Sequence, residues 1–194
     1  MPIKLTGGFH PNSTVLSSNG EVSTASLRVG VELLTQDHGF QPLRWVQTEV
    51  APANLDLSWV RIEAGALGNR TTLRVVDDQY IAISGALISL HFGVEEVLAL
   101  ARHLVNDTTI KRCPAPASHP IRFSLDRPEL VYVNALKCES HFVEEVAQPL
   151  DREAEPEIFA MSSSDIVLAT PQIQHARPCL YKYEAELVAK ILGQ

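Results

Sequence analysis

Short stretches of alternating apolar and polar residues dominate the first ninety residues and constrain them to extended strands rather than helices. In Ser26–Leu33 every second residue is apolar, which is typical of a strand that buries one face. Asn19-Gly20 follows Thr14–Leu16, and an Asn-Gly pair favours a tight turn because both residues tolerate positive φ angles. We therefore predict strands at Thr14–Leu16 and Ser26–Leu33 and a hairpin turn at Asn19-Gly20.

Two further strands are predicted at Leu43–Val50 and Leu55–Glu63. In the second of these, the apolar phase changes between Trp59 and Val60, which predicts a bulge or an outward-facing tryptophan. An exposed Trp59 would offer an interaction surface to a partner. The alternative is a core position, which is more usual for tryptophans on adjacent strands.

The remaining strands frame a predicted hairpin. Thr71–Val76 and Tyr80–Leu90 lie on either side of Asp77-Asp78, a pair typical of a turn. Tyr80–Leu90 is apolar in both phases, so we expect a central strand that is covered on both faces. Ile121–Leu125 and Leu130–Cys138 are expected to add strands later in the chain.

The periodicity changes to 3.6 residues after Gly93, which predicts an amphipathic helix at about 94–105. A second amphipathic helix is expected at about 179–192. Strand runs that each end in a helix, without βαβ units, favour an α+β fold with a mainly antiparallel β-sheet and these two helices. We expect one domain over 1–194, with a sub-boundary at the proline-rich connection 112–120.

The stretches HFGVEEV at 91–97 and HFVEEV at 141–146 resemble each other. When the sequence is shifted by 49 positions, residues 77–97 align with 126–146 without gaps, and seven of the 21 positions are identical. The Val-Glu-Glu-Val parts coincide, whereas His91 and His141 are offset by one residue. An internal duplication of a strand-helix unit is one hypothesis, and coincidence is the other.

Composition and charge narrow the class of protein. The formal net charge is −7, and no basic cluster exceeds the pair Lys111-Arg112, which disfavours a nucleic-acid partner. The first residues lack the pattern of a signal peptide, and the longest apolar region, Tyr80–Phe92, is too short to cross a membrane. The widely spaced Cys113, Cys138 and Cys179 indicate reduced thiols. We expect a cytoplasmic protein that binds neither nucleic acid nor membrane.

Histidine, cysteine and glutamate gather in the two similar stretches. Imidazole, thiolate and carboxylate are zinc ligands, and three of them with a water form a hydrolytic centre. The pattern therefore offers a candidate site for zinc or another divalent metal at His91, Glu95, Cys138, His141 and Glu145. The alternative is structural, because glutamates in the first turn of a helix complement its dipole and a single Cys-x-x-His lacks a second pair.

Other nucleophiles are present without a decisive motif. Ser162–Ser164, Asp165 and His175 could form a triad, but no Gly-x-Ser-x-Gly turn accompanies the serines. Cys179 near the start of the predicted last helix is a candidate thiol nucleophile, with a half-buried apolar role as the alternative. Gly7-Gly8 lacks the residues of a phosphate-binding loop.

No single constellation therefore stands out as catalytic. We interpret the sequence as a cytoplasmic binding or interaction module that contacts a protein partner or self-associates, since β-sheets have edges that a partner can cover. A metal-assisted hydrolase that uses the His/Glu/Cys clusters around 91–96 and 138–145 is the competing hypothesis.

Overall fold

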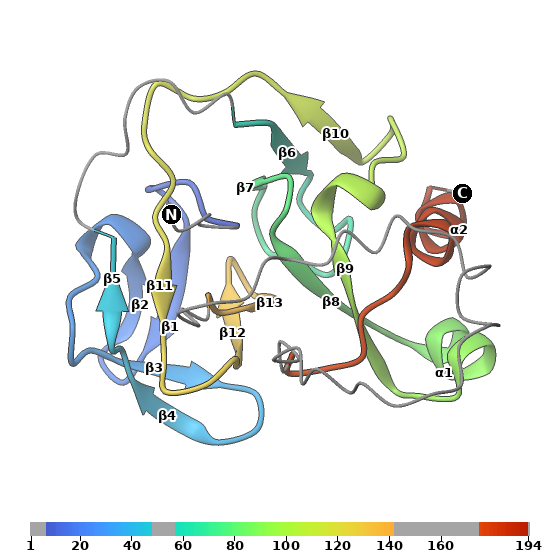
Figure 1. Cartoon of the computed structure of the whole chain (residues 1–194). Helices are drawn as coiled ribbons and strands as arrows, with labels where there is room; N and C mark the ends of the chain where they lie inside the picture. Colours follow the sequence, from blue (N-terminus) through green and yellow to red (C-terminus); the bar gives the residue numbers. More distant parts are fainter. Residues whose placement is uncertain (1–6, 48–56, 142–174, 194) are drawn as a thin grey trace, which may run out of the picture.

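The computed structural model describes residues 7–47, 57–141 and 175–193, and within these ranges the chain has an α+β fold (Figure 1). Every pair of neighbouring strands is antiparallel, which confirms the mainly antiparallel sheet predicted from the sequence. The strands are β1 (Thr14–Ser17), β2 (Gly20–Ser23), β3 (Glu32–Thr35), β4 (Gly39–Pro42), β5 (Trp45–Val46), β6 (Trp59–Ile62), β7 (Leu73–Val76), β8 (Tyr80–Ser84), β9 (Glu96–Leu100), β10 (Ile110–Cys113), β11 (Phe123–Ser124), β12 (Leu130–Val133) and β13 (Leu136–Glu139). The helices are α1 (Ala86–Phe92) and α2 (Lys182–Leu192), with 3-10 turns η1 (Thr24–Ser26) and η2 (Ala101–His103).

Within the described residues the strands form three sheets, and the buried apolar side chains form one large cluster and one small one. The largest has the order β2-β1-β3-β12-β13-β8-β9, with β4 paired to β3. A three-stranded sheet has the order β10-β6-β7, and β11 pairs with β5. Figure 1 shows β12 and β13 between a group formed by β1–β5 and a group that contains β8, β9 and both helices. β13 links the two groups because it pairs with both β12 and β8.

The hairpin predicted around Asp77-Asp78 is wrong, because β7 and β8 belong to different sheets. β7 pairs with β6, while β8 pairs with β9 and β13. Residues 77–79 are therefore a corner at which the chain passes from one sheet to the next. This corner matters for the site, since it brings Asp78 and Gln79 against the start of the described chain.

The helix predicted at 94–105 is also wrong. This region forms β9 followed by the short turn η2, and Val97, Leu98 and Ala99 are all buried. A strand covered on both faces carries a continuous apolar run, which periodicity alone cannot separate from a helix. The first helix lies earlier, at α1, and overlaps the second half of the stretch predicted as a strand at Tyr80–Leu90. Gly93 ends it in the left-handed conformation with φ +69°.

Two other predicted features differ from the structure. Within the predicted strand Ser26–Leu33, the residues before Glu32 form turns and loops, and Val29 is exposed. Trp59 is 2% exposed in β6, where its neighbour Val60 is also buried, so it offers no interaction surface. The change of phase reflects a strand that is covered on both faces.

Other predictions agree with the structure. The hairpin around Asn19-Gly20 is confirmed by the β1–β2 ladder, and the C-terminal helix is confirmed as α2, which begins three residues later than expected. The internal duplication is not confirmed, because Ala86 begins α1 whereas the aligned Ala135 lies in the turn between β12 and β13. No helix of the described residues is long and apolar enough to span a membrane.

Candidate functional site

The Gly7–Gly8 peptide unit is buried where the 77–79 corner meets the segment before β11. Its carbonyl oxygen and its amide are both hydrogen-bonded to side chains. The carbonyl oxygen of Gly7 accepts a hydrogen bond of 2.8 Å from Arg122 Nε. The amide of Gly8 donates to Gln79 Oε1 at 2.9 Å, and the amide of Gly7 donates to Asp78 Oδ1 at 2.7 Å. A cationic donor on a carbonyl oxygen draws electron density from the carbonyl carbon, so this geometry favours attack at Gly7.

Arg122 is fully buried and is held from two sides. Besides the bond to Gly7, its Nη1 donates to Gln47 Oε1 at 2.9 Å. Burial lowers the pKa of the guanidinium, and the carboxylate of Asp78 acts in the opposite direction. An arginine stays charged even so. The buried cation therefore places a permanent positive charge on the Gly7 carbonyl oxygen.

Gly8 has a conformation and surroundings that require glycine. Its φ is +132°, and a Cβ added there would lie 2.8 Å from Pro120 Cβ and 3.3 Å from Arg122 Cγ. Residue 8 thus brings the backbone close to its neighbours but supplies no nucleophilic side chain.

A polar network continues from this peptide unit through Gln79. Its Nε2 donates to the carbonyl oxygen of Glu139 at 2.8 Å. The Glu139 carboxylate is buried at the end of β13, where Oε2 lies 2.8 Å from His175 Nδ1 and Oε1 accepts from the amide of Ala176 at 2.7 Å. Glu139 therefore joins the Gly7–Gly8 site to a histidine far along the chain.

His175 lies beside Glu139. Burial alone would lower its pKa, but the hydrogen bond that the ring donates to the Glu139 carboxylate and the charge of that carboxylate contribute to raising the pKa to about 10. The ring is consequently an imidazolium at neutral pH. The Tyr80 ring covers it, with ring centroids 4.6 Å apart.

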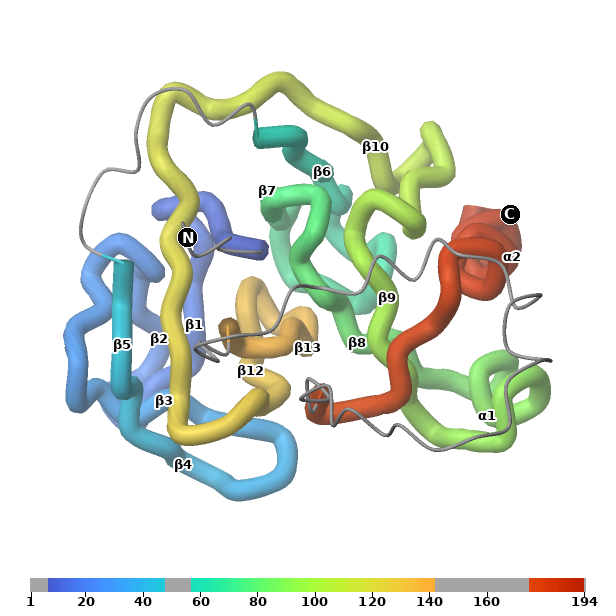
Figure 2. The backbone as a smooth tube through the Cα atoms, viewed as in Figure 1, coloured from blue at the N-terminus to red at the C-terminus, as the bar shows by residue number. Residues whose placement is uncertain are grey.

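The segment that carries His175 and Cys179 is docked beside β9, as Figure 2 shows for the stretch that leads to α2. Cys179 forms a parallel bridge with Leu98, whose amide donates to Pro178 O and whose carbonyl accepts from Leu180 N, both at 2.8 Å.

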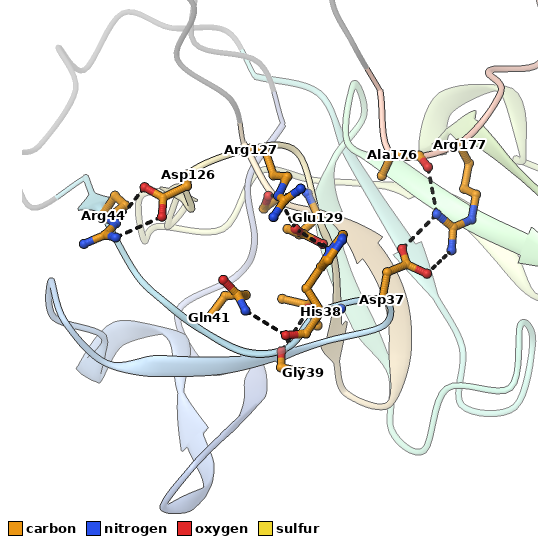
Figure 3. A network of polar contacts seen from close by, with 12 residues as sticks. Asp37, His38, Gly39, Gln41, Arg44, Asp126, Arg127, Glu129, Ala176 and Arg177 are labelled. Atoms are coloured by element: carbon orange, nitrogen blue, oxygen red, sulfur yellow. Dashed lines mark hydrogen bonds and ion pairs between the residues drawn. The ribbon is translucent and has the colours of Figure 1, made fainter.

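Arg177 holds the same segment to the body of the protein. Its guanidinium binds both Asp37 carboxylate oxygens, at 2.7 and 2.9 Å (Figure 3), and Nε lies 3.1 Å from Glu96 Oε2. Arg177 also lowers the pKa of the Asp37 carboxyl through these hydrogen bonds. Glu96 additionally contacts Lys137. These ion pairs fix the place of the segment on the large sheet.

The residues predicted as metal ligands are not brought together. His91 is exposed on α1, Glu95 is exposed before β9, and Cys138 is fully buried in β13. The ring of His141 lies against a tryptophan of β5, on the opposite side of the molecule from α1 in Figure 1. Glu145 lies outside the described residues, as do Ser162–Ser164 and Asp165. Among the described residues, no three His, Cys, Asp or Glu side chains form a group suited to a metal ion.

Comparison with known proteins identifies the family. The sequence of residues 7–145 matches the Hint domain family, and the match begins at the first glycine of the buried peptide unit. The chain belongs to the Hint domain family. No curated protein matches the sequence.

Solved structures similar to this Hint domain are inteins. The MchDnaB-1 intein is 13% identical, with a TM-score of 0.43 over 69% of this chain and 99% of that chain. The gp41-1 intein is 11% identical, with a TM-score of 0.44 over 68% and 97% of the two chains. The Msm DnaB1 intein splicing domain bound with zinc is 11% identical, with a TM-score of 0.43 over 69% and 98%.

Membership in the Hint family corrects the function inferred from the sequence. It contradicts both the binding or interaction module and the metal-assisted hydrolase. The site residues of this Hint domain were missed for a specific reason. Gly8 is 71 residues from Gln79 and Gly7 is 115 residues from Arg122, so no local spacing indicates that they meet. The Gly7-Gly8 pair is the local signal at this site, but on its own it suggests only a phosphate-binding loop, whose other residues are lacking.

Proposed function

We propose that this Hint domain is an autoprocessing domain that breaks or rearranges a peptide bond of its own chain, the bond between Gly7 and Gly8. The observation that carries the proposal is the contact of 2.8 Å between Arg122 Nε and the Gly7 carbonyl oxygen. Family membership supports it, since the match begins at Gly7.

The contacts favour cleavage of the Gly7–Gly8 bond by addition of a nucleophile followed by departure of the amine. A nucleophile adds to the Gly7 carbonyl carbon, and the negative charge that develops on its oxygen is stabilised by Arg122. Gln79 holds the amide of Gly8, the leaving group, in a fixed orientation. Because Gly8 has no side chain, the nucleophile in this chain is water or an added small nucleophile. With water, the C–N bond breaks, Gly7 becomes a carboxylate, and Gly8 takes up a proton as a free amine.

The full chain with an N-terminal carrier protein tests this directly. On incubation with hydroxylamine, which is a small nucleophile, we expect a released fragment that ends at Gly7 and a new N-terminus at Gly8, both read by intact mass. Arg122→Lys keeps a charge but changes the donor geometry, and we expect it to slow release by about 10²-fold, as for loss of one oxyanion donor.

Arg44→Gln is the matched control, because Arg44 is more than half exposed and pairs with Asp126 rather than with a residue of the site. We expect this variant to release the fragment at the native rate. Equal rates in Arg122→Lys and native protein, or cleavage at other bonds only, would refute the proposal. Circular dichroism of each variant verifies that the fold persists.

A further inference from the structure

Gln79 is the buried side chain that holds the amide of Gly8, and both ends of its own amide group are fixed. Its Oε1 accepts a hydrogen bond from the Gly8 amide at 2.9 Å. Its Nε2 donates to two backbone carbonyl oxygens, that of Glu139 at 2.8 Å and that of Tyr80 at 3.1 Å. An amide nitrogen only donates and an amide oxygen only accepts. The two carbonyl oxygens therefore determine that Oε1 is the end that faces Gly8.

His175 contacts the side chains of both residues that supply these carbonyl oxygens. Its Nδ1 lies 2.8 Å from Glu139 Oε2, and its ring packs on the ring of Tyr80 with centroids 4.6 Å apart. Glu139 and Tyr80 are themselves neighbours, because they lie at the ends of the paired strands β13 and β8. One imidazole ring thus holds the two backbone positions that orient Gln79.

The segment that carries the histidine is itself held firmly. The amide of Ala176 donates to Glu139 Oε1 at 2.7 Å, so the carboxylate is bound through both oxygens. Arg177 binds both carboxylate oxygens of Asp37, at 2.7 and 2.9 Å (Figure 3). The next residues are hydrogen-bonded to β9 through their backbone. His175 therefore reaches the site from a fixed segment, which lies outside the part of the chain that matches the Hint family.

We propose that His175 is a positioning residue for cleavage at Gly7–Gly8. It acts through Glu139 and Tyr80, whose carbonyl oxygens orient Gln79, and it touches neither atom of the bond that breaks. The proposal rests on the proposed function for its effect on cleavage, since a fixed leaving amine favours the reaction. Its structural part, the hold on the leaving amide, is measurable in a chain that is not cleaved.

Hydrogen exchange of the Gly8 amide in the full chain, without hydroxylamine, tests this hold. Gly7-Gly8 is the sole Gly-Gly pair, so labelling with ¹³C-carbonyl and ¹⁵N glycine identifies the Gly8 amide. We expect His175→Ala to speed its exchange about 10-fold or more, because a hydrogen bond to a buried carboxylate is lost. The Gly30 amide, which donates to Leu43 O at 2.8 Å, is the internal reference and should be unchanged.

Two further variants separate positioning from a general loosening of the fold. His175→Asn keeps a side-chain donor close to the place of Nδ1, so we expect exchange at Gly8 within about 3-fold of the native rate. His38→Ala is the matched control, because His38 Nδ1 lies 3.0 Å from the buried carboxylate of Glu129, which also binds Arg127 (Figure 3). We expect this control to leave exchange at Gly8 unchanged.

Cleavage in hydroxylamine gives the second readout. We expect His175→Ala to slow release of the fragment that ends at Gly7 about 10-fold, and His175→Asn to restore most of the rate. A native rate of release in His175→Ala would overturn the role in cleavage. If the native chain is not cleaved at all, the proposed function fails, whereas the exchange rates still decide whether His175 holds the Gly8 amide.

The exchange experiment has clear contrary outcomes. Equal exchange at Gly8 in the native chain and in folded His175→Ala would overturn the proposal, as would an equal rise at Gly30 or the same rise in His38→Ala. If His175→Ala does not fold, Tyr80→Leu decides the question, because it removes the ring on which His175 packs and keeps the carbonyl oxygen. We expect faster exchange at Gly8 in that variant, and a native rate there would overturn the proposal.

Discussion

Replacing Arg122 with alanine is expected to lower the free energy of unfolding by about 3–5 kcal/mol, because it removes the donor to a buried carbonyl oxygen and to a half-buried amide oxygen and opens a cavity. The acceptors are the Gly7 carbonyl oxygen and Gln47 Oε1, which Arg122 binds at 2.8 and 2.9 Å. The guanidinium is among the most deeply buried side chains of the described residues.

Urea unfolding followed by circular dichroism measures this effect. Arg44→Ala is the control, since Arg44 and Asp126, which lie 2.7 Å apart, are both more than half exposed, and such surface pairs contribute little to stability. A loss for Arg122→Ala no larger than that of the control would show that the buried guanidinium does not organise the site.

Replacing Gly8 with alanine is expected to lower the free energy of unfolding by about 2–4 kcal/mol, from backbone strain and from overpacking together. The φ of +132° disfavours any side chain, and the new methyl would lie 2.8 Å from Pro120 Cβ. The change also displaces Arg122, whose Cγ would be 3.3 Å from the methyl.

Gly30→Ala separates the two causes, because Gly30 has φ +90° but no atom within 4 Å of an added Cβ. That variant should lose about 1–2 kcal/mol, the backbone part alone. Thermal or urea unfolding of both variants gives the difference. Equal losses at Gly8 and Gly30 would mean that the close approach to Pro120 adds nothing.

The sequence predicted the parts of the fold that local chemistry determines. The Asn19-Gly20 turn and the C-terminal amphipathic helix follow from neighbouring residues, and both are present. Between residues 80 and 105, part of the predicted strand is a helix and the predicted helix is a strand, and this difference has a physical cause. β9 is covered on both faces and is therefore a short apolar run. Such a run does not reveal whether tertiary contacts will make it a strand or a helix.

The candidate site could not be predicted from neighbouring residues, because tertiary contacts form it. Its contacts join Gly7 to Arg122 and Glu139 to His175, pairs separated by 115 and 36 residues. The sequence singled out His175 and Cys179, but each in a different hypothesis. The sequence predicts Cys179 near a helix start, whereas α2 begins at Lys182 and the backbone of Cys179 forms a bridge to β9.

One measurement follows the proposed bond itself. Gly7-Gly8 is the sole Gly-Gly pair in the sequence, so protein labelled with ¹³C-carbonyl and ¹⁵N glycine gives a single correlation between a carbonyl carbon and the following amide. The account predicts that in hydroxylamine this signal disappears from the native domain, and that it persists about 10²-fold longer in Arg122→Lys. A signal that stays at full intensity in the native domain for as long as in Arg122→Lys would contradict the account.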